Sequence, residues 1–174
     1  MVDMLSKAIQ IAAYWHGGQV DKSGAPYILH PLRVMMSVEG ETDKIVAVLH
    51  DVLEDTELTA DDLRAHKFSP EVREAVQALT RQTGEDYFDF ISRLAPNPIA
   101  RRVKIADIED NLSPARSGGI NMKLEARYQR ARHILLGTLK PRSESALNAL
   151  QEQNANIGND GEFGLPNSDG GYRV

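Results

Sequence analysis

The chain has 174 residues, which fits one domain that buries roughly two thirds of the surface its unfolded form exposes. It contains no cysteine, so disulfides, thiolate metal sites and a cysteine nucleophile are excluded. The net charge of −5 argues against broad attraction to nucleic acid, and the N-terminal region has no apolar run as long as a signal peptide or membrane span. We therefore expect a cytoplasmic protein that binds neither nucleic acid nor membrane, and its oligomeric state stays open.

Helical periodicity predominates along the chain, and no segment shows the alternation of a convincing strand. The sequence predicts helices at about residues 5–16, 30–38, 42–56, 59–67, 70–81, 85–95, 99–112 and 121–139. The expected N-cap residues are Thr42, Thr59, Ser69 and Asn97. Since no segment copies another, these helices predict an all-α fold, an irregular helical bundle.

The composition changes after Pro141. Residues 141–174 are rich in Asn, Gly, Ser and Asp and carry few large apolar side chains, which is typical of a flexible, low-complexity tail. We therefore expect one folded domain over residues 1–140, followed by a C-terminal tail over residues 141–174.

The predicted helix at 42–56 carries an unusual group of polar side chains. His50, Asp51, Glu54 and Asp55 lie within two turns of an otherwise apolar segment, and helical spacing makes them converge on one edge. Burying such a cluster is costly unless each carboxylate has a partner, and a divalent cation supplies one. The alternative is a solvent-facing acidic turn with an incidental histidine.

Two other segments offer further ligands. His30 begins a predicted helix after a tight loop, and Asp107 is a polar position on a later, largely apolar helix. A set of two imidazoles and two carboxylates suits manganese, iron or zinc better than calcium or magnesium. Such a metal lowers the pKa of a bound water and polarises a phosphoryl oxygen, so Glu54 and Asp55 would position and deprotonate that water.

Three motifs, in this order, resemble those of the RelA/SpoT HD hydrolases, a family that includes free-standing small alarmone hydrolases and the metazoan SpoT homologue. They are GGQVDKSGAPYILHPLRV, AVLHDVLEDT and RRVKIADIEDNL. The resemblance covers about residues 5–140 and implies an HD phosphohydrolase domain over residues 1–140. It also implies a divalent metal, usually manganese, and removal of the 3′-pyrophosphate from guanosine tetra- or pentaphosphate (ppGpp) by a metal-activated water.

The resemblance assigns roles residue by residue. The metal ligands would be His30, His50, Asp51 and Asp107. The catalytic acids would be Glu54 and Asp55. The residues that contact the nucleotide substrate would be Lys22, Ser23 and Asn111.

The chain departs from the family pattern in two places. Asp21 stands where the family usually has an arginine that packs against guanine, and a carboxylate cannot form that cationic stack. Residues 104–111 read KIADIEDN where the family tends to have KLADRLHN, so we expect the ligands to keep their geometry while their surroundings differ. Two alternatives stay open: a phosphatase on another nucleotide such as NADPH, and a non-catalytic nucleotide-binding HD module.

Several other side chains have simpler explanations. We expect His16 to be a structural histidine. We expect Tyr87, Phe88 and Phe90 to belong to the core rather than to a stacking platform. Lys104 lies one turn before a predicted metal ligand and is a candidate for contact with that carboxylate or with a phosphate.

Overall fold

The computed structural model describes residues 3–113 and 122–139. The helices are α1 (Met4–Trp15), α2 (Leu29–Ser37), α3 (Glu41–Leu49), α4 (Val52–Asp55), α5 (Ala60–Ala65), α6 (Pro70–Leu79), α7 (Tyr87–Leu94), α8 (Pro98–Leu112) and α10 (Met122–Leu135). Within the described residues there is no strand, and an isolated β-bridge joins Val20 to Pro26. The predicted all-α fold is confirmed, and the predicted tail lies outside the described residues. No helix in the two described stretches is both long and apolar enough to cross a membrane.

Side-chain caps begin several helices where the sequence predicts them. Thr59 accepts a hydrogen bond from the amide of Asp62, and the Asp62 carboxylate accepts one in return, which forms a capping box at α5. Ser69 caps α6 and Asn97 caps α8, each with a proline at the first helical turn. These three predicted caps are confirmed.

The predicted cap at Thr42 is wrong. Helix α3 begins at Glu41, one residue earlier, and follows Gly40, whose φ is 82°. Glycine adopts this backbone conformation without the steric penalty of a Cβ atom. The chain therefore turns into α3 through glycine rather than through a side-chain cap, and Thr42 lies inside the helix.

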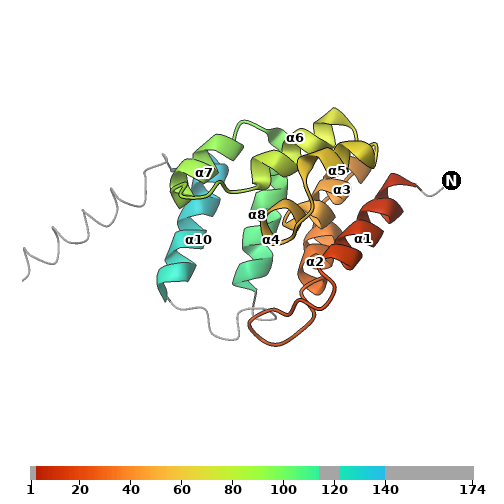
Figure 1. The fold of residues 1–174 in the computed structure, drawn as a ribbon. Coiled ribbons are helices and arrows are strands. Elements are labelled where there is room, and N and C mark those ends of the chain that lie inside the picture. The colour runs from red at the N-terminus through yellow and green to blue at the C-terminus, as the bar shows by residue number, and fades with distance from the viewer. Residues whose placement is uncertain (1–2, 114–121, 140–174) are drawn as a thin grey trace, which may run out of the picture.

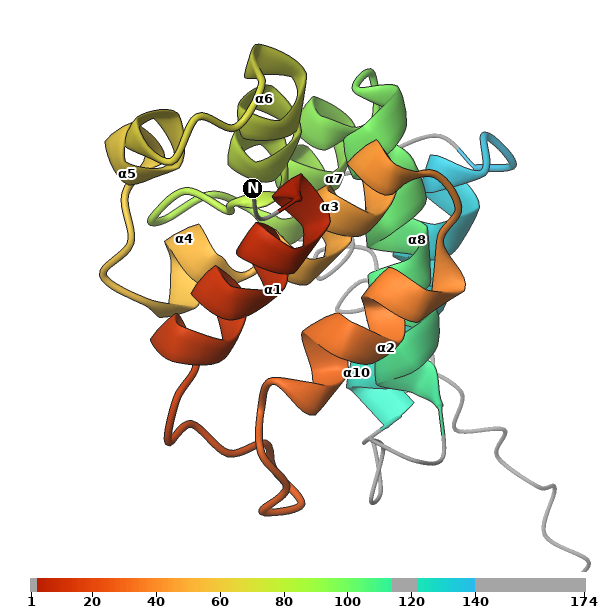
Figure 2. The same cartoon turned by 90° about the vertical axis from the view of Figure 1, so that its right-hand side faces the viewer.

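Helix α3 is the centre of the bundle. Residues 45–49 are all buried, and α1, α2, α6 and α8 pack around them. Figure 1 shows α8 between two groups, with α7 and α10 on one side and α1, α2 and α3 on the other. Figure 2 shows α2 running beside α8, in agreement with the packing of these helices. The helices α2, α3 and α8, which carry parts of the three motifs, therefore pack against one another although they are far apart in the sequence.

The long helix predicted over 42–56 is interrupted at the HD pair, so this prediction is wrong in detail. Helix α3 ends at Leu49, His50 and Asp51 form a turn, and α4 begins at Val52. The Nδ1 atom of His50 donates to the carbonyl of Ala47 over 2.7 Å. In a continuous helix that carbonyl would accept from the amide of Asp51, so the imidazole takes the bond that would prolong the helix.

Candidate metal centre

The turn after α3 lies against two other helices, and the three segments bring four polar side chains together. His30 comes from the first turn of α2, His50 and Asp51 come from the turn, and Asp107 comes from α8. The potential ligand atoms of His30, His50 and Asp107 all lie within 4.8 Å of one another. These three residues are only 2–4% exposed. The site therefore depends on the packing of α2, α3 and α8.

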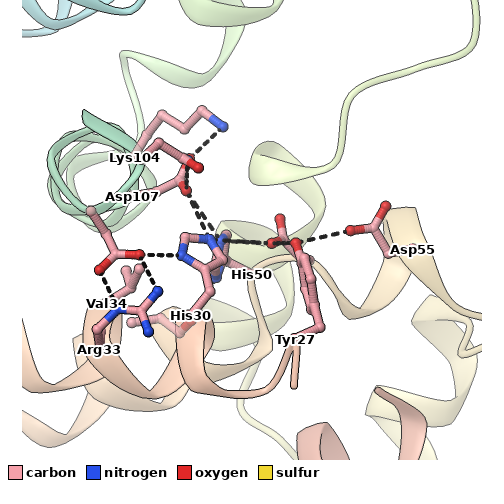
Figure 3. Close-up of polar contacts among 12 residues, drawn as sticks. Tyr27, His30, Arg33, Val34, His50, Asp55, Lys104 and Asp107 are labelled. Carbon is pink, nitrogen blue, oxygen red and sulfur yellow. Dashed lines mark hydrogen bonds and ion pairs between the residues drawn. The ribbon is translucent and has the colours of Figure 1, made fainter. Parts of the chain in front are cut away.

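The distances among the four side chains are short and similar. The Nε2 atom of His30 lies 3.1 Å from Asp107 Oδ1 and 3.6 Å from Asp51 Oδ2. The Nε2 atom of His50 lies 3.0 Å from Asp51 Oδ2 and 3.6 Å from Asp107 Oδ1. Figure 3 shows both imidazoles and the Asp107 carboxylate pointing toward this common point. Two imidazole nitrogens and two carboxylate oxygens thus face one small volume.

The charges in this volume favour a nearby cation. Burial would lower the pKa of His50, but the negative charges of Asp51 and Asp107 outweigh it and raise that pKa to about 10. Burial would raise the pKa of Asp107, but the Lys104 ammonium and the two imidazoles hold that pKa well below its ordinary value. Positive charge beside the carboxylates is therefore favoured, and a divalent cation supplies it in place of imidazole protons.

The donor set fits a transition metal. Within the described part of the chain, the buried Nε2 atom of His50 makes no hydrogen bond, although Asp51 Oδ2 is only 3.0 Å away. A buried polar atom without a hydrogen bond is costly, and coordination to a metal removes that cost. The mixed nitrogen and oxygen donors are those that manganese, iron and zinc accept.

Both histidines direct Nε2 into the site because Nδ1 is already used. His50 Nδ1 donates to the carbonyl of Ala47, and His30 Nδ1 lies 2.7 Å from Asp110 Oδ2. A hydrogen bond at one ring nitrogen fixes the orientation of the imidazole and leaves the other nitrogen for a metal.

Asp110 and Arg33 were missed in the sequence analysis as parts of the site. Asp110 accepts hydrogen bonds from Arg33 Nε over 2.6 Å and from an Arg33 terminal nitrogen over 3.0 Å, in addition to its contact with His30. The available signal was the position of Asp110, three residues after Asp107 and hence on the same face of α8.

The two predicted catalytic acids lie on α4, beside the cluster, in different surroundings. The Tyr27 hydroxyl donates to Asp51 Oδ2 over 2.5 Å, and the same hydroxyl lies 3.1 Å from Asp55 Oδ2. The Glu54 carboxylate instead accepts from the backbone amide of Arg81 over 3.0 Å. Burial is the main cause that raises the pKa of both Glu54 and Asp55. Tyr27 joins Asp55 to the predicted metal site, although we did not predict a role for it.

Asn111 and Lys104 both contact Asp107. The Asn111 amide donates to Asp107 Oδ1 over 2.7 Å, and the Lys104 ammonium lies 2.8 Å from Asp107 Oδ2. The candidate contact between Lys104 and this carboxylate is therefore present. Asp107 consequently has a fixed orientation, with one oxygen aimed at the two imidazoles.

Lys22 and Ser23 lie in the exposed loop between α1 and α2, and neither contacts the cluster in the described structure. The Asp21 carboxylate accepts hydrogen bonds from the amide and the hydroxyl of Ser23, over 2.8 and 2.6 Å, and from the amide of Ala25 over 3.0 Å. Asp21 therefore organises the turn of its own loop.

The remaining candidates lie in the interior. His16 is 2% exposed, donates from Nδ1 to the Gln19 side chain over 2.8 Å and packs its ring 5.0 Å from that of Tyr27. The three aromatic residues predicted as core are buried: Tyr87, Phe88 and Phe90. That prediction is confirmed.

Comparisons with known proteins agree with the motifs. No protein-family model matches the chain. It is 32% identical over 121 residues to guanosine-3′,5′-bis(diphosphate) 3′-pyrophosphohydrolase of Aquifex aeolicus. The aligned stretch covers 62% of this chain and 17% of that protein. The chain is 39% identical over 88 residues to a probable enzyme of the same name from Mycoplasma genitalium, 48% of this chain and 12% of that protein. A GTP pyrophosphokinase of Streptomyces antibioticus is 32% identical over 145 residues, 75% of this chain and 16% of that protein.

A solved structure shares the fold. It is described as a metazoan orthologue of SpoT that hydrolyses ppGpp, and it matches with a TM-score of 0.62 at 22% identity, covering 91% of this chain and 97% of that one. The HD-type bundle is therefore confirmed. The chain spans only 12–17% of the length of the three sequence relatives named above. In sequence and in fold, the chain is thus a relative of the RelA/SpoT HD proteins, as its three motifs predict.

Proposed function

We propose that the chain is a metal-dependent phosphohydrolase that removes the 3′-pyrophosphate from guanosine tetra- or pentaphosphate. One observation carries the proposal: His30, His50 and Asp107 are buried together with their ligand atoms within 4.8 Å of one another, and Asp51 adjoins them. The residues of the cluster belong to the three motifs that resemble the family, and several sequence relatives are named as enzymes of this reaction.

The proposed ligands are His30, His50, Asp51 and Asp107, and the proposed metal is manganese. When bound, such a cation lowers the pKa of a water molecule and withdraws charge from the phosphoryl group under attack. The chain itself fixes the ligand geometry through anchored imidazoles and through Asp107, which Asn111 and Lys104 hold from outside.

The proposed catalytic acids, Glu54 and Asp55, would orient the attacking water and take up its proton. Partial burial raises the pKa of each carboxyl, which makes its anion a better proton acceptor. Asp55 has the stronger structural support, because Tyr27 ties it to Asp51. Glu54 is oriented by the amide of Arg81, which leaves its second oxygen for other contacts.

The proposed substrate contacts are Lys22, Ser23 and Asn111. Lys22 is exposed, and its loop leads directly into α2, where His30 lies. A lysine ammonium in this place suits a phosphate or the base of a nucleotide. Asn111 lies beside Asp107 and is thus next to the proposed metal.

The relatives carry two kinds of name, pyrophosphohydrolase and pyrophosphokinase, and both kinds concern guanosine nucleotides. We favour hydrolysis because the proposed metal ligands and catalytic acids are the residues that the HD motifs assign to it. We also propose that the chain acts on free nucleotides, since its net charge of −5 does not favour a polyanionic partner.

One observation favours a second candidate, a phosphatase that acts on another nucleotide such as NADPH. Asp21 replaces the arginine that would stack on guanine, and its carboxylate is engaged by Ser23 and Ala25 within the loop. A different base is therefore compatible with the same metal chemistry. A module that binds a nucleotide without turnover is less favoured, because Glu54 and Asp55 are both present.

Pyrophosphate release from ppGpp by the purified protein with manganese tests the proposal. Asp51→Ala, Glu54→Gln and addition of a chelator serve as parallel controls. We expect release that all three controls abolish or strongly reduce. Release of inorganic phosphate from NADPH, without pyrophosphate release from ppGpp, would replace the substrate and keep the phosphohydrolase. Bound manganese without turnover of any nucleotide would support the non-catalytic module.

A further inference from the structure

His30 is held on the side away from the proposed metal. Its Nδ1 atom lies 2.7 Å from Asp110 Oδ2, while its Nε2 atom faces Asp107 and Asp51. Since Asp110 only accepts hydrogen bonds when it is ionised, the proton of the ring resides on Nδ1 in this contact. The lone pair of Nε2 is then available on the side of the cluster.

Asp110 is itself held in place by Arg33. The guanidinium forms two hydrogen bonds with the two oxygens of the carboxylate, over 2.6 and 3.0 Å. The Asp110 side chain is 10% exposed and that of Arg33 is 38% exposed, so the pair runs from the surface to the buried imidazole. A bidentate pair restricts the carboxylate to one orientation, which a single hydrogen bond does not.

The geometry connects three residues in a line that ends at the site. Arg33 is one turn after His30 on α2, and Asp110 is one turn after Asp107 on α8. Helix α8 thus supplies the proposed ligand Asp107 and, through Asp110, orients His30. Helix α2 supplies His30 together with Arg33, which holds Asp110. Figure 3 shows the Arg33 guanidinium and the His30 ring on the same carboxylate.

We propose that Asp110, clamped by Arg33, is a positioning residue that sets the tautomer and the direction of His30 for metal binding. This inference rests on the proposed metal site. It concerns a position at which the chain departs from the KLADRLHN pattern, where histidine stands in place of Asp110. A carboxylate behind a ligating imidazole fixes the ring and makes it a stronger ligand.

Manganese affinity, measured by competition with a chelator at one pH, tests this inference apart from turnover. Asp110→Ala removes the acceptor, and we expect it to weaken binding about 10- to 100-fold. Asp110→Asn keeps an acceptor without the charge and should bind with intermediate affinity. The matched control is Glu109→Gln, because Glu109 is 51% exposed and pairs with Arg132 on the surface; its affinity should equal that of the wild type.

The double variant Arg33→Gln/Asp110→Ala separates orientation from charge. In Asp110→Ala alone, an unpaired arginine is left near the site and would repel a cation. If Asp110 acts by orienting His30, the double variant stays weak, whereas full recovery of affinity would overturn the inference. Wild-type affinity in Asp110→Ala would overturn it as well. Thermal unfolding of the metal-free proteins shows whether a variant has lost its fold. If Asp110→Ala does not fold, Asp110→Asn replaces it, and wild-type manganese affinity in Asp110→Asn would overturn the inference.

The test distinguishes this inference from the proposed function. A wild-type protein that binds no manganese would overturn both. Binding that is equal in the wild type and the Asp110 variants would overturn only the role of Asp110. Metal binding without ppGpp turnover would leave that role intact and revise only the proposed activity.

Discussion

The hydroxyl of Tyr27 lies 2.5 Å from a carboxylate oxygen of Asp51. The same hydroxyl is 3.1 Å from Asp55, so one phenol connects a proposed metal ligand to a proposed catalytic acid. The Tyr27 ring packs against two imidazoles, with centroids 5.0 Å from His16 and 5.8 Å from His30. The polar end of this side chain can therefore be removed while its ring keeps its packing.

Tyr27→Phe should reduce turnover of the nucleotide about 10- to 100-fold, the usual effect of losing an outer partner of a metal site. Without the hydroxyl, Asp51 and Asp55 lose their shared donor and repel each other. The matched control is Tyr14→Phe, since Tyr14 is 77% exposed on α1. Steady-state kinetics of both variants check the prediction. Equal kcat values for Tyr27→Phe and the wild type would show that the bridge has no part in the reaction.

Manganese should raise the stability of the protein through the four clustered residues. A ligand that binds only the folded state adds about 2.7 kcal/mol to the free energy of unfolding at 100 times its Kd. We expect His50→Gln to lose this gain, because the Nε2 atom of His50 faces the site. His133→Gln, on the exposed surface of α10, should keep it. Thermal unfolding with and without manganese gives the comparison, and an equal gain in all three proteins would place the metal elsewhere.

The residues of the proposed metal site could be singled out from the sequence because they are polar side chains at helical spacing within apolar segments. His50 and Asp51 stand out in this way, as does Asp107. Tyr27 and Arg33 could not, because their partners lie far away in the sequence, and for Asp110 the sequence offered only its place on the same face of α8 as Asp107. The contact of His30 with Asp110 spans 80 residues, and that of Arg33 spans 77. Only the packing of α2 against α8 creates these bonds.

The interrupted helix has a similar cause. Periodicity favours one helix over 42–56, since the apolar positions continue through Val52 and Leu53. At the interruption, His50 donates a local hydrogen bond to the Ala47 carbonyl, which hydrophobic spacing does not indicate. At the break, Asp51 has φ of −100° and ψ of −6°, away from the ideal dihedrals of an α-helix. Glu54 and Asp55 lie on α4, after the break, where they contact Arg81 and Tyr27.

The residue just before the HD pair should be important for stability. Leu49 is fully buried in the centre of the bundle, at the end of α3. Leu49→Ala should lower the free energy of unfolding by about 2–5 kcal/mol, because the truncation leaves a cavity. Met36→Ala is the control, since Met36 is 74% exposed and should change stability little. Urea unfolding of both variants checks the values, and a loss below about 1 kcal/mol for Leu49→Ala would indicate a core that collapses around the gap.

A surface ion pair away from the site should make stability depend on pH. Arg93 forms two hydrogen bonds with the Glu85 carboxylate, over 2.7 and 2.9 Å. These bonds lower the pKa of Glu85 in the folded protein below its ordinary value of 4.5. The stabilisation is therefore complete above pH 4.5, the pKa expected of the unfolded chain, and is lost as the pH falls through the lower pKa of the folded state.

Glu85→Gln should accordingly lower the free energy of unfolding by about 1 kcal/mol at pH 7, a modest value because Arg93 is partly exposed. The difference from the wild type should shrink below pH 4.5, as the wild-type carboxylate itself becomes protonated. Asp61→Asn is the control, because the pair of Asp61 with Arg64 is largely exposed and should contribute little. Urea unfolding at several pH values follows both differences. A Glu85→Gln deficit that stays constant from pH 7 into acid would mean that packing, and not the charge of Glu85, stabilises this corner of the bundle.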